Sequence, residues 1–183
     1  DAMKHLGPAY VAELRALLDP ASHRMDLATE RGDRSQDAFS VSAPGVPAML
    51  FVGVRSGDLE SDVEIAHEAG HAVHGEWMQR GHASPLQRNG SQWLTEAFAI
   101  YNELRFRDQL YQQAQDPRAK AYYLKSLLDD MNHMSAEHDR GDIDVMVVDS
   151  KFPGEFGVMA RGINGMVGTH IATKKNVMAC VAE

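Results

Sequence analysis

The sequence predicts a mainly α protein, α+β by count, in which a small antiparallel sheet lies beside long helices. Two observations support this class. Apolar residues recur at helical spacing in four segments, and two short apolar runs rich in β-branched or aromatic residues have the composition of strands. The 183 residues, 44% of them hydrophobic and 24% charged, suffice for one domain with its own core. We therefore expect a single domain over residues 1–183.

The N-terminal part is expected to form one helix and then two strands. Pro8 suits the first turn of a helix, an apolar stripe follows it, and Asp19-Pro20 ends the helix. Polar, turn-like residues come next. The strands are expected at 38–43 and 48–54, where the segment PGVP separates them.

Three longer helices are expected in the middle of the chain. The first covers about 62–79, with Ser61 or Asp62 as its cap. The others cover about 92–113 and 118–134, where large apolar residues repeat every three or four positions.

Residues 139–183 are expected to form a divergent tail. Within it, 143–148 has the composition of a strand, and 154–170 is rich in glycine and methionine with no clear period. The sequence begins with Asp1 instead of methionine, which suggests a piece of a larger chain.

Charge and composition exclude several classes of function. A net charge of −8 disfavours nucleic-acid binding, which needs clustered lysine and arginine. No apolar run reaches the roughly 18 residues of a transmembrane helix, so no membrane partner is expected. Cys180 is the only cysteine and cannot form an internal disulfide, which fits a reducing, cytoplasmic location.

Residues 67–74 read HEAGHAVH and carry the main chemical signal. His67 and His71 are four residues apart, so on a helix both imidazoles project from one side and can bind one ion. Zn²⁺ suits this pair, and Glu68 beside it can act as a general base toward water. This HExxH pattern is a signature of zinc metalloproteases.

A third ligand is expected from the next helix. Glu96 lies 25 residues after His71, and a returning antiparallel helix would bring its carboxylate to the histidines. Two imidazoles and one carboxylate leave a fourth position for water, as in catalytic zinc sites. Glu103, two turns further, is expected either to orient a ligand histidine or to pair with Arg105 or Arg107. His74 is expected to pack or to support the site and not to bind the ion.

The segments DVEIAHEAGHAVH and ASPLQRNGSQWLTEAFAIYNELRF resemble the catalytic core of the thimet oligopeptidase and oligoendopeptidase F family of zinc peptidases. The likeness covers about residues 24–106. It implies a zincin-like core in which His67, His71 and Glu96 bind zinc and Glu68 is the catalytic base and acid. It further implies that oligopeptides are the substrates, and that their backbone lies along an edge strand within 48–54.

The sequence departs from this family after the third ligand. The family has a His- and Tyr-bearing segment there that stabilises the oxyanion, whereas the last tyrosine here is Tyr123. The main hypothesis is therefore a zinc-dependent endopeptidase. The alternative is an inactive zinc-binding or peptide-binding remnant. A further alternative comes from membrane-anchored ATP-dependent proteases, which share HEAGHA but take an aspartate as third ligand.

Overall fold

The computed structural model describes residues 4–29, 37–55, 57–81 and 92–182. The chain divides into two compact units, Asp1–Ala114 and Gln115–Glu183. This division lies upstream of residue 139, where the sequence predicted the start of a tail. That the whole chain acts as a single catalytic domain stays a prediction.

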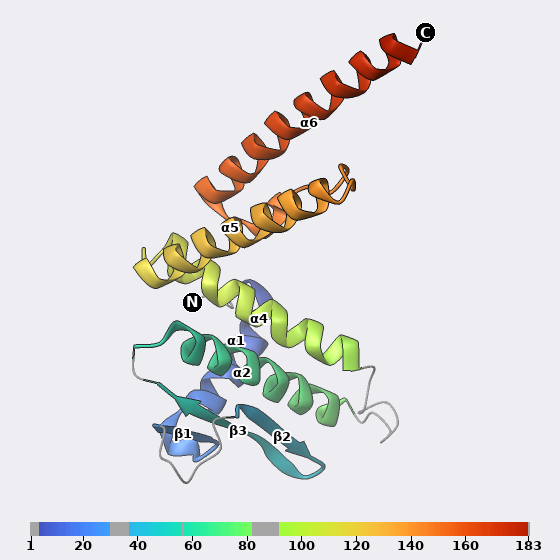
Figure 1. Ribbon diagram of the computed structural model, residues 1–183. Coiled ribbons are helices and arrows are strands. Elements are labelled where there is room, and N and C mark those ends of the chain that lie inside the picture. Colours follow the sequence, from blue (N-terminus) through green and yellow to red (C-terminus); the bar gives the residue numbers. More distant parts are fainter. Residues whose placement is uncertain (1–3, 30–36, 56, 82–91, 183) are drawn as a thin grey trace. The chain divides into compact units, whose positions relative to one another are not determined.

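In its described residues, the first unit contains a small sheet and three α-helices (Figure 1). The helices and two strands expected in this unit are present, with bounds that differ by up to three residues, whereas the helix expected at 118–134 extends five residues further in the second unit. One further strand, β1, was not predicted. The elements in chain order are η1 (Lys4–Leu6), α1 (Pro8–Leu18), η2 (Pro20–Ser22), β1 (Met25–Thr29), β2 (Phe39–Ala43), β3 (Val46–Val54), α2 (Leu59–Arg80) and α4 (Gln92–Gln112).

The start of α2 differs from the prediction because another residue caps it. Asp58 has an extended backbone, and its Oδ2 accepts a hydrogen bond from the backbone N–H of Ser61 at 3.3 Å. The Ser61 hydroxyl instead accepts a hydrogen bond from the backbone N–H of Arg55 at 3.0 Å. Glu60 and Asp62 then lie in the first turn, where negative charge stabilises a helix.

The sheet is mixed and not antiparallel, and its order is β1-β3-β2. β1 pairs parallel to β3 and β2 pairs antiparallel to it. The backbone N–H of Leu50 donates to the carbonyl of Arg24 at 2.9 Å, which continues the parallel pairing just before β1. β3 is therefore the central strand, and the expectation of an edge strand within 48–54 is wrong. β1 and β2 form the two edges.

The core of this unit lies between α2, α1 and the sheet. Leu50 and Val52 of β3 pack with Ala69 and Val73 of α2, and Tyr10 of α1 is fully buried among them. α2 lies between the sheet and α4, and it contacts both (Figure 1). The small side chain of Ala69 permits this close packing, and this side of α2 faces the sheet.

The approach of α2 to β2 depends on a glycine. A Cβ atom added to Gly75 would lie only 2.5 Å from Oγ of Ser42, so a larger residue could not be accommodated without movement. This contact brings the edge strand β2 against the same helix that carries His67 and His71.

The second unit is helical: α5 (Pro117–Asp139) is followed by η3 (Asp149–Lys151) and α6 (Gly154–Ala182). Asp116 caps α5, since its Oδ1 accepts from the backbone N–H of Arg118 at 2.8 Å. None of the described helices has an apolar stretch long enough to span a bilayer.

Two expectations for the tail are wrong. Residues 143–148 do not form a strand, because the side-chain amide of Asn164 bonds both the N–H of Val147 (3.1 Å) and its carbonyl (2.8 Å). Residues 154–170, expected to lack regular structure, lie within α6. Phe156, Ala160 and Ile163 recur at helical spacing there, and the many glycines conceal this period.

Candidate metal centre

Helix α2 holds the two histidines on one side. Because Ala69 and Val73 are buried in the core, the residues half a turn away face outward from it. Nε2 of His67 and Nε2 of His71 lie 3.2 Å apart, with the two rings at 79° to each other. Both imidazoles are partly buried.

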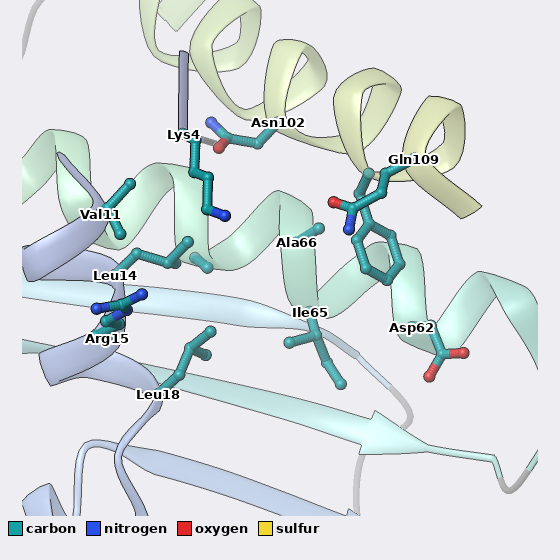
Figure 2. A pocket seen from close by; sticks show the side chains of 12 residues that line it. Lys4, Val11, Leu14, Arg15, Leu18, Asp62, Ile65, Ala66, Asn102 and Gln109 are labelled. Carbon is teal, nitrogen blue, oxygen red and sulfur yellow. The ribbon is translucent and has the colours of Figure 1, made fainter. Parts of the chain in front are cut away.

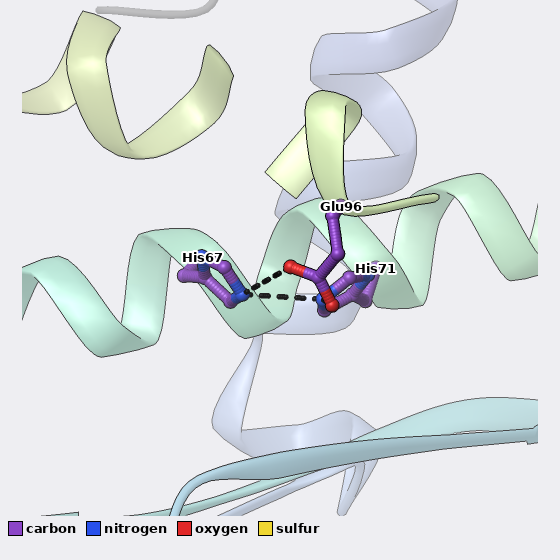
Figure 3. Close-up of side chains that lie close together, drawn as sticks. All are labelled: His67, His71 and Glu96. Carbon is purple, nitrogen blue, oxygen red and sulfur yellow. Dashed lines mark hydrogen bonds and ion pairs between the residues drawn. The ribbon is translucent and has the colours of Figure 1, made fainter. Parts of the chain in front are cut away.

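Helix α4 supplies the carboxylate. Oε2 of Glu96 lies 3.5 Å from Nε2 of His67, and Oε1 lies 3.5 Å from Nε2 of His71 (Figure 3). One donor atom from each of the three residues lies within 4.8 Å of the others. The structure thus brings together the three side chains that the sequence singled out as a ligand set.

The donor atoms fit a tetrahedral metal ion. Ligands about 2.0–2.2 Å from a tetrahedral ion are separated from one another by about 3.3–3.6 Å. The two Nε2 atoms are 3.2 Å apart, and each lies 3.5 Å from a different oxygen of Glu96, so these separations are close to that range. Two nitrogens and one carboxylate oxygen would leave the fourth position open, as zinc enzymes require for catalysis.

Glu103 orients the first histidine. Its Oε2 lies 3.2 Å from Nδ1 of His67, so this carboxylate can accept a hydrogen bond from the Nδ1–H group. In that tautomer Nε2 carries a free lone pair. The other oxygen of Glu103 accepts a hydrogen bond from Nη1 of Arg107. Of the expected alternatives, Glu103 therefore contacts both His67 and Arg107, whereas Arg105 pairs with Asp108 at 3.4 Å.

Arg107 connects the two helices that carry the donors. It is 5% exposed, and its Nη2 lies 3.1 Å from Oε2 of Glu60 at the start of α2. The pattern Glu103–Arg107, four residues apart on one helix, was a detectable signal for this pair. Its link to Glu60 could not be read from the sequence, because it depends on how α2 and α4 pack.

Glu68 lies beside the three donors and faces an open cavity. The residue is 8% exposed and lines a cavity of about 370 Å³ that also has His67 in its wall. Within the described parts of the chain, Glu68 has no hydrogen bond and no ion pair. A carboxylate in this environment is free to exchange a proton with a small molecule in the cavity.

Burial and charge act on the second histidine. Burial lowers the pKa of the His71 imidazole, and neighbouring Glu68 and Glu96 partly oppose this by raising it. The neutral imidazole is the form that can donate a lone pair to a metal ion.

His74 does not join the donor group. Its ring stacks on Phe98 of α4, with ring centroids 5.4 Å apart, and burial lowers its pKa. The packing role that the sequence favoured for this residue agrees with these contacts.

Asn102 is a buried polar residue that sequence reasoning missed. Its Nδ2 donates to the carbonyl of Phe98 at 2.8 Å, and its Oδ1 accepts from the hydroxyl of Tyr10 at 2.5 Å. This pair ties α4 to α1 behind the donor group. A lone asparagine within an apolar helical pattern, next to Glu103, was the only sequence signal for it.

A second, mainly apolar cavity of about 530 Å³ lies between α1, α2 and α4 (Figure 2). Leu14, Leu18 and Ile65 belong to its wall, and the charged side chains of Lys4 and Arg15 also line it. The described lining has a single carboxylate, Asp62, and no histidine. The candidate chemistry therefore lies at the other cavity.

Comparisons with known proteins give limited likenesses. No family model matches the chain. Over 82 residues the chain is 32% identical to the methyl-accepting chemotaxis protein McpB of Pseudomonas aeruginosa, which covers 45% of this chain and 12% of that protein. A solved structure from Chlamydophila abortus, of a protein proposed to be a peptidase, matches with a TM-score of 0.56 at 19% identity.

The structural match covers 82% of this chain but 27% of the other, so the chain spans only a small part of either protein. At this level of identity, the match supports a peptidase-like fold and no more.

Proposed function

We propose that this chain is a zinc-dependent endopeptidase that hydrolyses oligopeptides. The convergence of one donor atom each from His67, His71 and Glu96, all within 4.8 Å of one another, carries the proposal. The peptidase-like fold and the HExxH pattern support it.

The proposed ligands are Nε2 of each histidine and the carboxylate of Glu96. A zinc ion held there supplies Lewis acidity, which polarises a carbonyl group and lowers the pKa of water to about 7. Glu103 keeps His67 in the required tautomer by accepting a hydrogen bond from its Nδ1–H group.

Glu68 is the proposed general base and acid. Its carboxylate takes one proton from a water molecule while the oxygen of that water bonds to the carbonyl carbon of the peptide. The same carboxyl group then gives the proton to the amide nitrogen as the C–N bond breaks. The products are a carboxylic acid and an amine, and Glu68 returns to its starting state.

An extended substrate would pair with β2 and not with β3. β3 has partners on both sides, whereas β2 is an edge strand. Asp37 and Ala38, directly before β2, line the same cavity as His67 and Glu68. A peptide added to this edge would pass the donor group.

The test combines metal analysis with peptide cleavage. We expect one zinc per chain and cleavage of internally quenched oligopeptides. Glu68→Gln should retain the zinc and lose at least about 10²-fold in kcat, whereas Asp129→Asn, at an exposed position of α5, should change neither. A Glu68→Gln variant that cleaves as fast as the parent would contradict the role of Glu68.

Two results would favour the alternatives. Stoichiometric zinc without cleavage across a mixed peptide library would favour an inactive zinc-binding remnant. Retention of zinc by Glu96→Ala would favour a site with an aspartate as third ligand, as in the ATP-dependent proteases.

A further inference from the structure

The cavity beside the candidate metal centre has a strongly acidic wall. It is bounded by the first half of α2, by α4 and by the two residues before β2. Because His67 and Glu68 belong to this wall, a peptide bound at the donor group would extend into it. Among the residues that the structure describes, five carboxylates and one guanidinium line the cavity: those of Asp37, Glu60, Glu64, Glu68, Glu103 and Arg107.

The guanidinium of Arg107, the one cation among the described lining residues, already has anionic partners. Arg107 bonds to Glu103 on its own helix and to Glu60 of α2 at 3.1 Å. Glu64 and Glu68, by contrast, have no hydrogen bond or ion pair in the part of the chain that the structure describes. Since they lie four residues apart on α2, their side chains lie next to each other along one face of the helix.

Glu68 is buried, which makes its lack of a hydrogen-bond or charge partner among the described residues informative. At 8% exposure, a carboxylate ordinarily has a hydrogen-bond or charge partner, because an unpaired buried charge is costly. Burial raises the pKa of the Glu64 carboxyl group, and nearby Asp58 and Glu60 raise it further, whereas Arg55 acts in the opposite direction. Among the described lining residues, carboxylates thus outnumber cations, and a positively charged group of a ligand would find partners there.

We propose that this cavity receives a cationic group of the oligopeptide substrate, and that Glu64 selects it. The group would be a lysine or arginine side chain or a free N-terminal ammonium. This inference rests on the proposed peptidase function, in which Glu68 is engaged with water. Glu64, one helical turn away, is then the carboxylate free to pair with the substrate.

The first test measures selectivity with the zinc-loaded protein. A series of quenched peptides carries Lys, Gln or Glu at one position at a time, with a free or an acetylated N-terminus. At one position we expect kcat/KM for Lys to exceed that for Gln by about tenfold, with Glu lowest. An effect that disappears on acetylation alone would assign the cation to the N-terminus.

The variant Glu64→Gln should reduce the ratio of Lys to Gln peptides to near one. The matched control Asp129→Asn removes the same charge at an exposed position of α5 and should keep the parent ratio. A preference for Lys that survives in Glu64→Gln would overturn the role of Glu64.

A second measurement separates this inference from the proposed function. Equilibrium binding of the same labelled peptides to metal-free protein involves no cleavage. A Lys preference that Glu64→Gln removes would support the cavity even if no peptide is hydrolysed. Equal binding of the Lys, Gln and Glu peptides would overturn the inference. It would also be overturned if the protein showed no peptide preference but bound Ca²⁺ stoichiometrically, and if Glu64→Gln lost that Ca²⁺ binding.

Discussion

Gly70 of α2 and Ala99 of α4 meet almost backbone to backbone. A Cβ atom added to Gly70 would lie 3.0 Å from Cα of Ala99 and 2.8 Å from Nδ2 of Asn102. Gly70 directly precedes His71, and Ala99 lies three residues after Glu96. The glycine therefore sets the helix separation at which the proposed ligands from the two helices can meet.

Gly70→Ala should push α4 away from α2. We expect a loss of about 1–3 kcal/mol in the free energy of unfolding, because overpacking outweighs the better helix propensity of alanine. Zinc affinity should fall too, since Glu96 moves with α4. Chemical denaturation and competition with a zinc chelator measure the two effects.

Gly162→Ala provides the matched control for this change. An added Cβ at Gly162 of α6 meets nothing within 4 Å, so the helix there should gain about 0.5–1 kcal/mol. If Gly70→Ala lowered neither the free energy of unfolding nor zinc affinity, as expected of Gly162→Ala, the close approach of α2 and α4 would not be required for the site.

Glu103→Gln should weaken zinc binding without abolishing it. The variant keeps the shape of the side chain but loses the carboxylate that holds Nδ1 of His67. Loss of such a supporting group typically lowers metal affinity by about 10–100-fold. Chelator competition gives the affinity, and Asp108→Asn on the same helix, where Asp108 pairs with Arg105, should leave it unchanged.

Glu76→Ala should strongly destabilise the first unit. Oε1 of this buried glutamate accepts hydrogen bonds from the backbone N–H of Ala48 (2.5 Å) and from Nη2 of Arg24 (2.7 Å). It thereby joins α2 to β3 and to the start of β1. Removing one partner of such a buried charge pair costs about 3–5 kcal/mol.

Urea denaturation of Glu76→Ala, beside Asp129→Asn as a surface control within about 0.5 kcal/mol of the parent, measures this cost. A loss below 1 kcal/mol would show that Arg24 finds sufficient compensation in Glu13, which lies 3.4 Å away.

Tyr10 should make stability depend on alkaline pH. Burial raises the pKa of its hydroxyl to about 12, although the hydrogen bond to Asn102 acts in the opposite direction. Below pH 10 the tyrosine is neutral in both folded and unfolded states. Between pH 10 and 12 only the unfolded chain ionises, so stability should fall by about 2–3 kcal/mol as pH rises.

Tyr10→Phe should lose this alkaline decrease in stability. At neutral pH it should lower the free energy of unfolding by about 1 kcal/mol, because the side-chain carbonyl oxygen of Asn102 loses its donor. Denaturation curves at pH 8 to 12 compare the two proteins. Parallel curves for parent and variant would contradict the raised pKa.

The parts of the structure that follow from local sequence were the ones predicted. Helical spacing located α2 and α4, and the i, i+4 rule indicated that His67 and His71 share a face. The approach of Glu96 followed from a returning helix. The role of β1 did not, because its five residues of mixed polarity pair in parallel only with residues of β3 that lie 25 positions further on.

Glycine content caused the other large error. α6 contains glycines at 157, 162, 165 and 168, which lower helix propensity enough to suggest irregular structure. Tertiary contacts reverse that preference, since Asn164 bonds the backbone of Val147. Likewise, the Arg107–Glu60 pair depends on the packing of two helices and leaves no trace in the sequence alone.

The boundary between residues 114 and 115 gives the chain a modular character. Every donor atom of the candidate centre, the supporting Glu103 and Arg107, and the acidic cavity precede that point. All described donor atoms therefore come from one compact unit, and the described residues after 114 supply none of them.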